Sequence, residues 1–170
     1  MLGSALIPAF IGAGHEVVAT DIDLSNPSPW GDRGPTFQHL DVREPGAVAA
    51  AVAAHDVDFL CRLAAETDLE VSDADPAHAY LTNTVATKYA AFAARDADIP
   101  MVYISTAGVF DGHKHEAYHE WDDAVPLNLY GKTKYEGEAY VERWVPKYYI
   151  VRAGWTVSYT HLTLPTTPYV

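Results

Sequence analysis

The stretch "DPAHAYLTNTVATKYAAFAARDADIPMVYIST", residues 75–106, decides the fold because it leads a long helix directly into a buried strand. Asp75 and Pro76 are typical of an N-cap and a first helical residue, and the Ala-rich segment continues to about Arg95. The segment "PMVYIST" (100–106) is short and apolar, as expected of a buried strand. A helix followed by such a strand is half of a βαβ unit, in which the strands run parallel.

The same alternation extends to both ends of the chain. Ala-rich or amphipathic segments predict helices, and apolar segments between them predict strands. The sequence therefore predicts an α/β fold with a parallel sheet. Further helices are expected over 2–13, 44–55 (opened by Pro45) and 128–144, and further strands over 16–21, 36–42, 57–65 and 148–154, with loops at 26–35 and 107–126.

Composition limits the function classes. The 170 residues are 49% hydrophobic and 20% charged, which is typical of one soluble globular domain. A formal net charge of -12 disfavours nucleic-acid and membrane partners, because binding to phosphates requires clustered Lys and Arg. The single cysteine, Cys61, lies in an apolar segment, so a reduced thiol and a cytoplasmic location are expected. The apolar opening of the chain lacks the cationic start of a signal peptide.

Tyr130 and Lys134 stand four positions apart in the predicted helix 128–144. Residues at this spacing share a helix face, with Cβ atoms roughly 6 Å apart. A nearby ammonium group lowers a tyrosine pKa from about 10 and makes the phenol a competent general acid or base. An isolated pair of this kind is more often a surface feature of an amphipathic helix, so the neighbouring segments have to decide.

Two strand ends carry polar residues. Thr106 ends the predicted strand 100–106, and Asp21 ends the strand 16–21. Parallel sheets bind ligands at the carboxyl ends of their strands, where an acidic residue binds the ribose 2′-hydroxyl of NAD and repels the extra phosphate of NADP. Taken alone, a threonine at the position of Thr106 is more often a capping or turn residue. The alternative interpretation of Asp21 is an ordinary loop aspartate without a role in binding.

Together these segments resemble the extended short-chain dehydrogenase/reductase family, in its dTDP-4-dehydrorhamnose reductase-like and sugar-nucleotide epimerase branch. The ordered set of Thr, Tyr and Lys is the specific part, and the similarity covers residues 1 to about 155. The segments that carry it are "LAAETDLE" (63–70), "LTNTVAT" (81–87), "STAGVFDG" (105–112), "YHEWDDAVPLNLYGKTKYEGE" (118–138) and "VRAGW" (151–155).

The resemblance implies an NAD(P)-dependent oxidoreductase that reduces a keto group of a nucleotide-linked sugar. Tyr130 would donate a proton to the sugar carbonyl oxygen, and Thr106 would hydrogen-bond the same oxygen. Lys134 would hold the nicotinamide ribose and lower the tyrosine pKa, while Asn83 would support the lysine. Trp155 would pack against the sugar.

The same resemblance implies NAD as the cofactor, with NADP as the alternative. Asp21 would bind the adenosine ribose, and Asp41 and Val42 would bind the adenine. The full set of residues expected to contact the dinucleotide is Met1, Leu2, Gly3, Asp21, Asp41, Val42, Leu63, Ala64, Ala65, Tyr130 and Lys134.

Departures from the family pattern refine these expectations. Arg62 stands at a strand end where the family has a small or polar residue, so this cation either contacts the pyrophosphate or is merely tolerated. Sugar-nucleotide dehydratases of the superfamily have an Asp-Glu pair where Ala107 and Gly108 follow Thr106, which disfavours dehydration.

The resemblance also predicts which parts of the fold the chain contains. Only the last three positions of the glycine-rich turn correspond to residues 1–3, so a Rossmann-like doubly wound sheet is expected without its first, central strand and without the C-terminal substrate lobe. Residues 1–155 are expected to form a partial NAD(P)-binding domain, and 156–170 a non-native or disordered tail. We therefore expect the printed chain to be inactive and to bind NAD weakly or not at all.

Alternative functions remain open from the sequence. An epimerase would use the same residues, and a non-catalytic dinucleotide-binding regulatory subunit would use the same fold. The expected partner is a nucleotide-sugar substrate, without nucleic acid or membrane, and a homodimer is left open. The loop "DGHKHEAYHEWDD" (111–123) offers histidines and acids, but it has no spacing typical of a zinc site, so no metal is expected.

Overall fold

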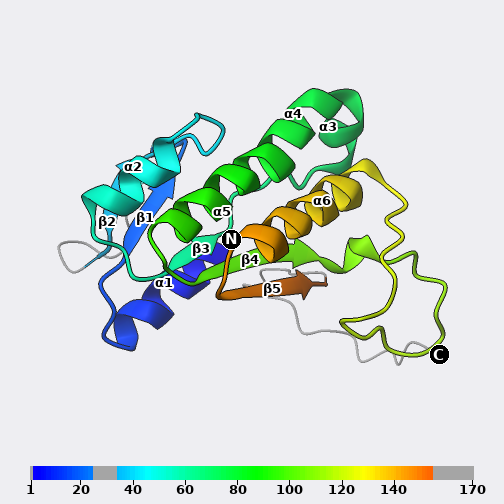
Figure 1. The fold of residues 1–170 in the computed structure, drawn as a ribbon. Coiled ribbons are helices and arrows are strands. Elements are labelled where there is room, and N and C mark those ends of the chain that lie inside the picture. The colour runs from blue at the N-terminus through cyan, green and yellow to red at the C-terminus, as the bar shows by residue number, and fades with distance from the viewer. Residues whose placement is uncertain (1, 25–33, 155–170) are drawn as a thin grey trace, which may run out of the picture.

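The computed structural model describes residues 2–24 and 34–154, and Figure 1 shows strands and helices in alternation. Met1, Trp155 and the segment 156–170 lie outside the described residues. The strands are β1 (Val18–Asp21), β2 (Thr36–His39), β3 (Leu60–Arg62), β4 (Met101–Thr106) and β5 (Tyr148–Ala153). The helices are α1 (Leu2–Gly12), α2 (Ala47–Ala54), α3 (Leu69–Ala74), α4 (Pro76–Tyr80), α5 (Ala86–Asp96) and α6 (Leu129–Trp144), with a π-helical turn η2 (Leu81–Val85) and a 3-10 turn η3 (Ala107–Val109).

Every strand pairing is parallel, which confirms the predicted α/β class. One sheet contains β1 and β2, and the other has the order β3-β4-β5. Among the described residues no strand pairing joins the two sheets. A cavity of ≈ 1180 Å³ is lined by both β1 and β3, the strands that each have a single pairing partner on their outer side.

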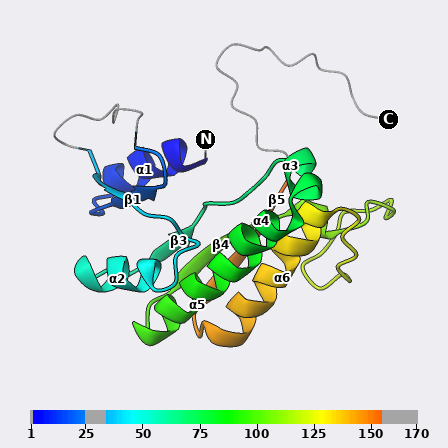
Figure 2. The ribbon, with the colours of Figure 1, turned by 90° about the horizontal axis from the view of Figure 1, so that it is seen from above.

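Helices cover both sides of the strands. Figure 2 shows α1 on one side, and α2, α5 and α6 on the other. The alanine-rich stripe of α5 lets this helix pack closely against both α2 and α6. The core between helices and strands includes Leu40, Val48, Val52, Ala90, Ala91, Ala94, Met101, Tyr103 and Val141. This layered arrangement places the carboxyl end of β4, with the turn η3 that follows it, beside the start of α6 (Figure 1).

Several elements differ from the sequence expectations, and the strands β2 and β3 are shorter than predicted. Helix α2 begins at Ala47 rather than at Pro45, because Gly46 before it has a left-handed backbone with φ of 83°. The predicted helix from 75 to about 95 is interrupted by the π-helical turn η2. Helix α3 was not expected, although its N-cap signal is present: the Asp68 carboxylate accepts hydrogen bonds from the two amides of Glu70 and Val71.

No helix within 2–24 and 34–154 combines the length and the hydropathy needed to cross a lipid bilayer.

Gly137 allows α6 to approach β4 and η2 closely. A Cβ atom at this position would lie 2.5 Å from the Tyr103 hydroxyl oxygen and 3.0 Å from the Asn83 carbonyl oxygen. Gly137→Ala should therefore lower the free energy of unfolding by about 1–3 kcal/mol, measured by urea denaturation. Gly12→Ala is the matched control, because a Cβ there meets nothing within 4 Å. Equal stability of the two variants would contradict the packing described.

Candidate active site

The start of α6 is fixed against the end of β4. The Asn128 side chain caps the helix by accepting a 2.7 Å hydrogen bond from the Gly131 amide. A Cβ on Gly131 would overlap the Gly108 carbonyl oxygen in the turn after Thr106, so this glycine permits the contact. The helix therefore brings Tyr130 close to Thr106.

Tyr130 and Thr106 form the polar pair of the site. Burial raises the pKa of Tyr130, and a side-chain hydrogen bond with Thr106 opposes that rise. The Thr106 hydroxyl oxygen also accepts a 3.0 Å hydrogen bond from the Gly108 amide, which fixes its orientation. The expectation that Lys134 lowers the tyrosine pKa is wrong for this arrangement, because burial dominates and Lys134 is directed elsewhere.

The Lys134 ammonium lies beneath this pair against an aromatic ring. Its Nζ atom is 4.2 Å from the centroid of the Tyr103 ring, and the residue is only 2% exposed. Among the described residues no hydrogen bond joins this ammonium to Tyr130. Burial lowers the pKa of Lys134 to about 7, and the nearby positive charge of Arg62 acts in the same direction, while Glu138 opposes it.

Asn83 is fully buried and connects three parts of the chain. Its amide oxygen accepts a 2.9 Å hydrogen bond from the Glu66 backbone amide. Its amide nitrogen donates to the Glu66 carbonyl at 2.9 Å and to the Thr133 hydroxyl at 3.0 Å. Asn83 therefore holds the loop after β3 against the residue preceding Lys134, rather than contacting the lysine itself. Whether it supports catalysis stays a prediction.

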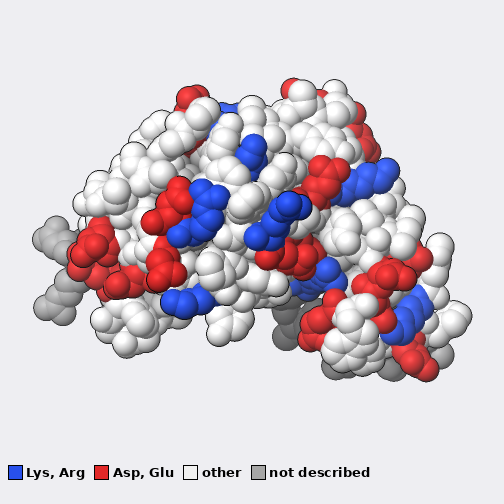
Figure 3. All heavy atoms as spheres, viewed as in Figure 1, with Lys and Arg blue, Asp and Glu red and all other residues white. Residues whose placement is uncertain are grey.

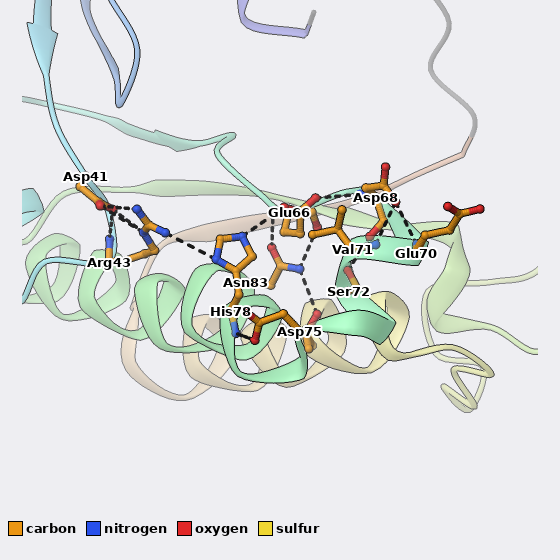
Figure 4. Close-up of polar contacts among 11 residues, drawn as sticks. Asp41, Arg43, Glu66, Asp68, Glu70, Val71, Ser72, Asp75, His78 and Asn83 are labelled. Atoms are coloured by element: carbon orange, nitrogen blue, oxygen red, sulfur yellow. Dashed lines mark hydrogen bonds and ion pairs between the residues drawn. The ribbon is translucent and has the colours of Figure 1, made fainter.

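A chain of polar contacts extends from this point to the end of β2 (Figure 4). The Glu66 carboxylate lies 3.1 Å from His78 Nε2, and His78 Nδ1 lies 3.5 Å from the Arg43 guanidinium. Arg43 in turn forms a 2.6 Å ion pair with Asp41, whose pKa it lowers to about 2. Sequence analysis missed Arg43, Glu66 and His78. His78 lies 35 positions from Arg43 and 12 positions from Glu66 along the chain, so only the folded structure shows that these side chains are in contact.

Seven of the eleven residues expected to contact the dinucleotide line the cavity between the sheets. Asp21 ends β1, and its carbonyl oxygen accepts a 2.9 Å hydrogen bond from Leu40, which brings the ends of β1 and β2 together. Asp41, Tyr130 and Lys134 lie outside the cavity lining. The lining includes Leu2, Gly3, Asp21, Val42, Leu63, Ala64 and Ala65 from the expected set.

Arg62 lies buried at the carboxyl end of β3. It is 4% exposed, and its guanidinium donates hydrogen bonds to the carbonyl oxygens of Ala64 and Thr82. The side chain is thus built into the protein rather than merely tolerated. Its contact with a pyrophosphate stays a prediction.

Charges on the surface are mixed rather than segregated. Figure 3 shows basic and acidic side chains interspersed on one face. An anionic ligand would therefore have to be attracted by individual cationic groups at its binding site rather than by a broad positive surface. In the loop 111–123, Lys114 pairs with Asp122 at 2.6 Å and His119 stacks on Trp121. The described part of the chain contains no group of three or more His, Cys, Asp or Glu residues arranged to hold a metal ion.

Comparison with known proteins assigns this geometry to a family. The family model described as RmlD substrate binding domain matches residues 1–166. The chain belongs to the RmlD substrate-binding domain family. This membership confirms the resemblance to the extended short-chain dehydrogenase/reductases stated from the sequence.

Relatives of this RmlD-family chain include two dTDP-4-dehydrorhamnose reductases. The protein from Aggregatibacter actinomycetemcomitans is 33% identical over 159 residues, which cover 91% of this chain and 48% of the relative. The protein from Mycolicibacterium smegmatis is 31% identical over 156 residues, with coverage of 91% and 42%. The chain spans about half the length of the curated relatives it matches.

Solved structures agree with the fold. A dTDP-4-dehydrorhamnose reductase from Bacillus anthracis, in complex with NADP, aligns with a TM-score of 0.67 and 29% identity over 75% of this chain and 47% of that one. A UDP-glucose 4-epimerase from Thermotoga maritima aligns with a TM-score of 0.78 over 89% of this chain and 52% of that one. At 21% identity the second likeness concerns the fold alone. The Rossmann-like fold predicted from the sequence is confirmed.

Lys134→Met should stabilise the chain in a pH-dependent manner. The lysine pKa falls from 10.5 to about 7 on folding, so the cost of burying the ammonium is complete below pH 7 and disappears as pH rises toward 10.5. The variant should gain about 1 kcal/mol or more in unfolding free energy at pH 6, with the gain shrinking above pH 7. Urea denaturation across this pH range measures it.

The exposed Lys132→Met on the same helix serves as the control and should show no such pH-dependent gain. A Lys134→Met gain that stays constant up to pH 10 would contradict the lowered pKa.

Proposed function

We propose that this chain carries the catalytic residues of an NAD(P)-dependent reductase acting on a keto group of a nucleotide-linked sugar. The observation that supports it most directly is the Thr106–Tyr130 pair at the carboxyl end of β4, next to the buried Lys134. Parallel sheets bind their ligands at this edge. The dTDP-4-dehydrorhamnose reductases among the relatives supply the substrate class.

The geometry suits proton donation to a carbonyl oxygen. The raised pKa of Tyr130 keeps its phenol protonated at neutral pH, as a general acid requires. The Thr106 hydroxyl, already oriented by the Gly108 amide, can donate a second hydrogen bond to the same oxygen. Two donors at one oxygen would stabilise the negative charge that develops there during reduction. A bound nicotinamide would supply the hydride.

Several residues that the family resemblance assigns to the dinucleotide line the cavity between the sheets. The first residues of α1, Leu2 and Gly3, line it, and the free amides at the start of a helix favour phosphate groups. Asp21 lines the same cavity at the carboxyl end of β1, as expected for a residue that contacts the adenosine ribose. The small side chains of Ala64 and Ala65 line the same cavity after the end of β3. A homodimer and a cytoplasmic location stay predictions.

Tyr130→Phe removes the proposed proton donor and keeps the ring. In the full-length protein we expect NADH oxidation with a dTDP-linked 4-keto sugar to fall at least about 100-fold, while NADH binding measured by calorimetry stays nearly unchanged. Tyr135→Phe, an exposed tyrosine on the same helix, is the matched control and should keep its activity. Retained turnover in Tyr130→Phe would exclude the assignment.

Asp21→Asn tests the cofactor preference. Removing the carboxylate should raise the ratio of kcat/KM with NADPH to that with NADH about tenfold, because the repulsion of a 2′-phosphate is lost. Asp73→Asn, an exposed aspartate on α3, should leave that ratio unchanged. An unaltered ratio in Asp21→Asn would show that this carboxylate does not face the adenosine ribose.

A further inference from the structure

Arg62 is a buried cation for which the proposed reaction has no role. It ends β3, pairs in register with Tyr103 of β4, and is 4% exposed. Its Nη1 and Nη2 groups donate to the carbonyl oxygens of Ala64 and Thr82, the latter at 2.8 Å. Within the described residues its Nε atom has no hydrogen-bond partner. A guanidinium buried in this way is costly, which points to a function beyond packing.

The two carbonyl acceptors place Arg62 between the two halves of the site. Ala64 belongs to the loop that lines the cavity, and Thr82 lies in the π-helical turn immediately before Asn83. Turns of this kind occur frequently at functional sites. The guanidinium therefore joins the cavity loop to the turn that carries Asn83, and Asn83 in turn donates a hydrogen bond to Thr133, the residue before Lys134 in α6.

Arg62 and Lys134 are two buried cations around one ring. Arg62 interacts electrostatically with Tyr103, and the Lys134 ammonium lies 4.2 Å from the centroid of that ring. Neither cation forms an ion pair among the described residues. The buried acid that faces them, Glu138, is 1% exposed and already pairs with Arg152 of β5 at 2.7 Å.

Charged or titratable groups surround Lys134 from each element that packs against it. They are Arg62 from β3, Tyr103 from β4, Glu138 from α6, and Arg152 from β5 through its pairing with Glu138. Because Glu138 is shared with Arg152, the repulsion between Arg62 and Lys134 is only partly compensated.

We propose that Arg62 is a positioning residue for Lys134, which ties the loop after β3 to the turn of Asn83 and holds a second buried positive charge beside the ring that Lys134 contacts. Burial is the larger cause of the lowered pKa of Lys134, and the charge of Arg62 lowers that pKa further. The relevance to turnover rests on the proposed function, whereas the charge coupling between the two residues does not.

Nuclear magnetic resonance tests the coupling in the chain itself. The Cε and Hε shifts of Lys134, assigned by their loss in Lys134→Met, are followed from pH 5 to pH 11. The wild-type midpoint should lie near pH 7. Arg62→Gln, which keeps a hydrogen-bond donor and removes the charge, should raise this midpoint by about one unit or more. Arg62→Lys, which keeps the charge, should leave it low.

The surface substitution Arg143→Gln is the matched control and should leave the midpoint unchanged. A wild-type midpoint near 10.5, or an unshifted midpoint in folded Arg62→Gln, would overturn the proposal. The titration uses neither cofactor nor substrate, so its outcome is independent of whether the proposed reaction is correct.

Discussion

The Lys134 ammonium is held against the face of Tyr103 with only 2% of the residue exposed, and the rest of the site is arranged around that contact. A cation in this position weakens the fold, because burial penalises its charged form. The surrounding packing holds it in place: Gly137 lets α6 approach the Tyr103 hydroxyl, and that hydroxyl donates a hydrogen bond to the Lys134 carbonyl at 3.2 Å. Such a local cost, supported by the neighbouring packing, is typical of functional positions.

The end of β3 connects the surroundings of Lys134 to the cavity between the sheets. Residues 63–65 line the cavity, and the next residue, Glu66, is bound on both sides of its backbone by Asn83. From Glu66 the polar contacts continue through His78 to Arg43 at the end of β2. Movement of the loop would therefore disturb both the expected dinucleotide path and the segment before Lys134. The loop after β3 therefore contacts both the cavity between the sheets and, through Asn83, the helix that carries Lys134.

Sequence reasoning predicted what depends on local patterns. The helical spacing of Tyr130 and Lys134 and the strand end at Thr106 follow from periodicity, and the structure brings Thr106 and Tyr130 together. What it did not predict depends on tertiary burial. The ammonium meets the ring of Tyr103, thirty-one positions away, instead of the Tyr130 phenol. The direction of the tyrosine pKa shift was wrong for the same reason. The role of Arg62 also required knowing that its side chain is buried.

Transfer of deuterium tests the central claim most directly, namely that this site reduces a keto group of a nucleotide-linked sugar. The full-length protein is incubated with NADH carrying deuterium on the transferable position of C4 and with a dTDP-linked 4-keto sugar, and the sugar nucleotide is examined by mass spectrometry. We expect a reduced product carrying one deuterium, formed together with NAD. An epimerised sugar of unchanged oxidation state, or no conversion while NADH is bound, would contradict it.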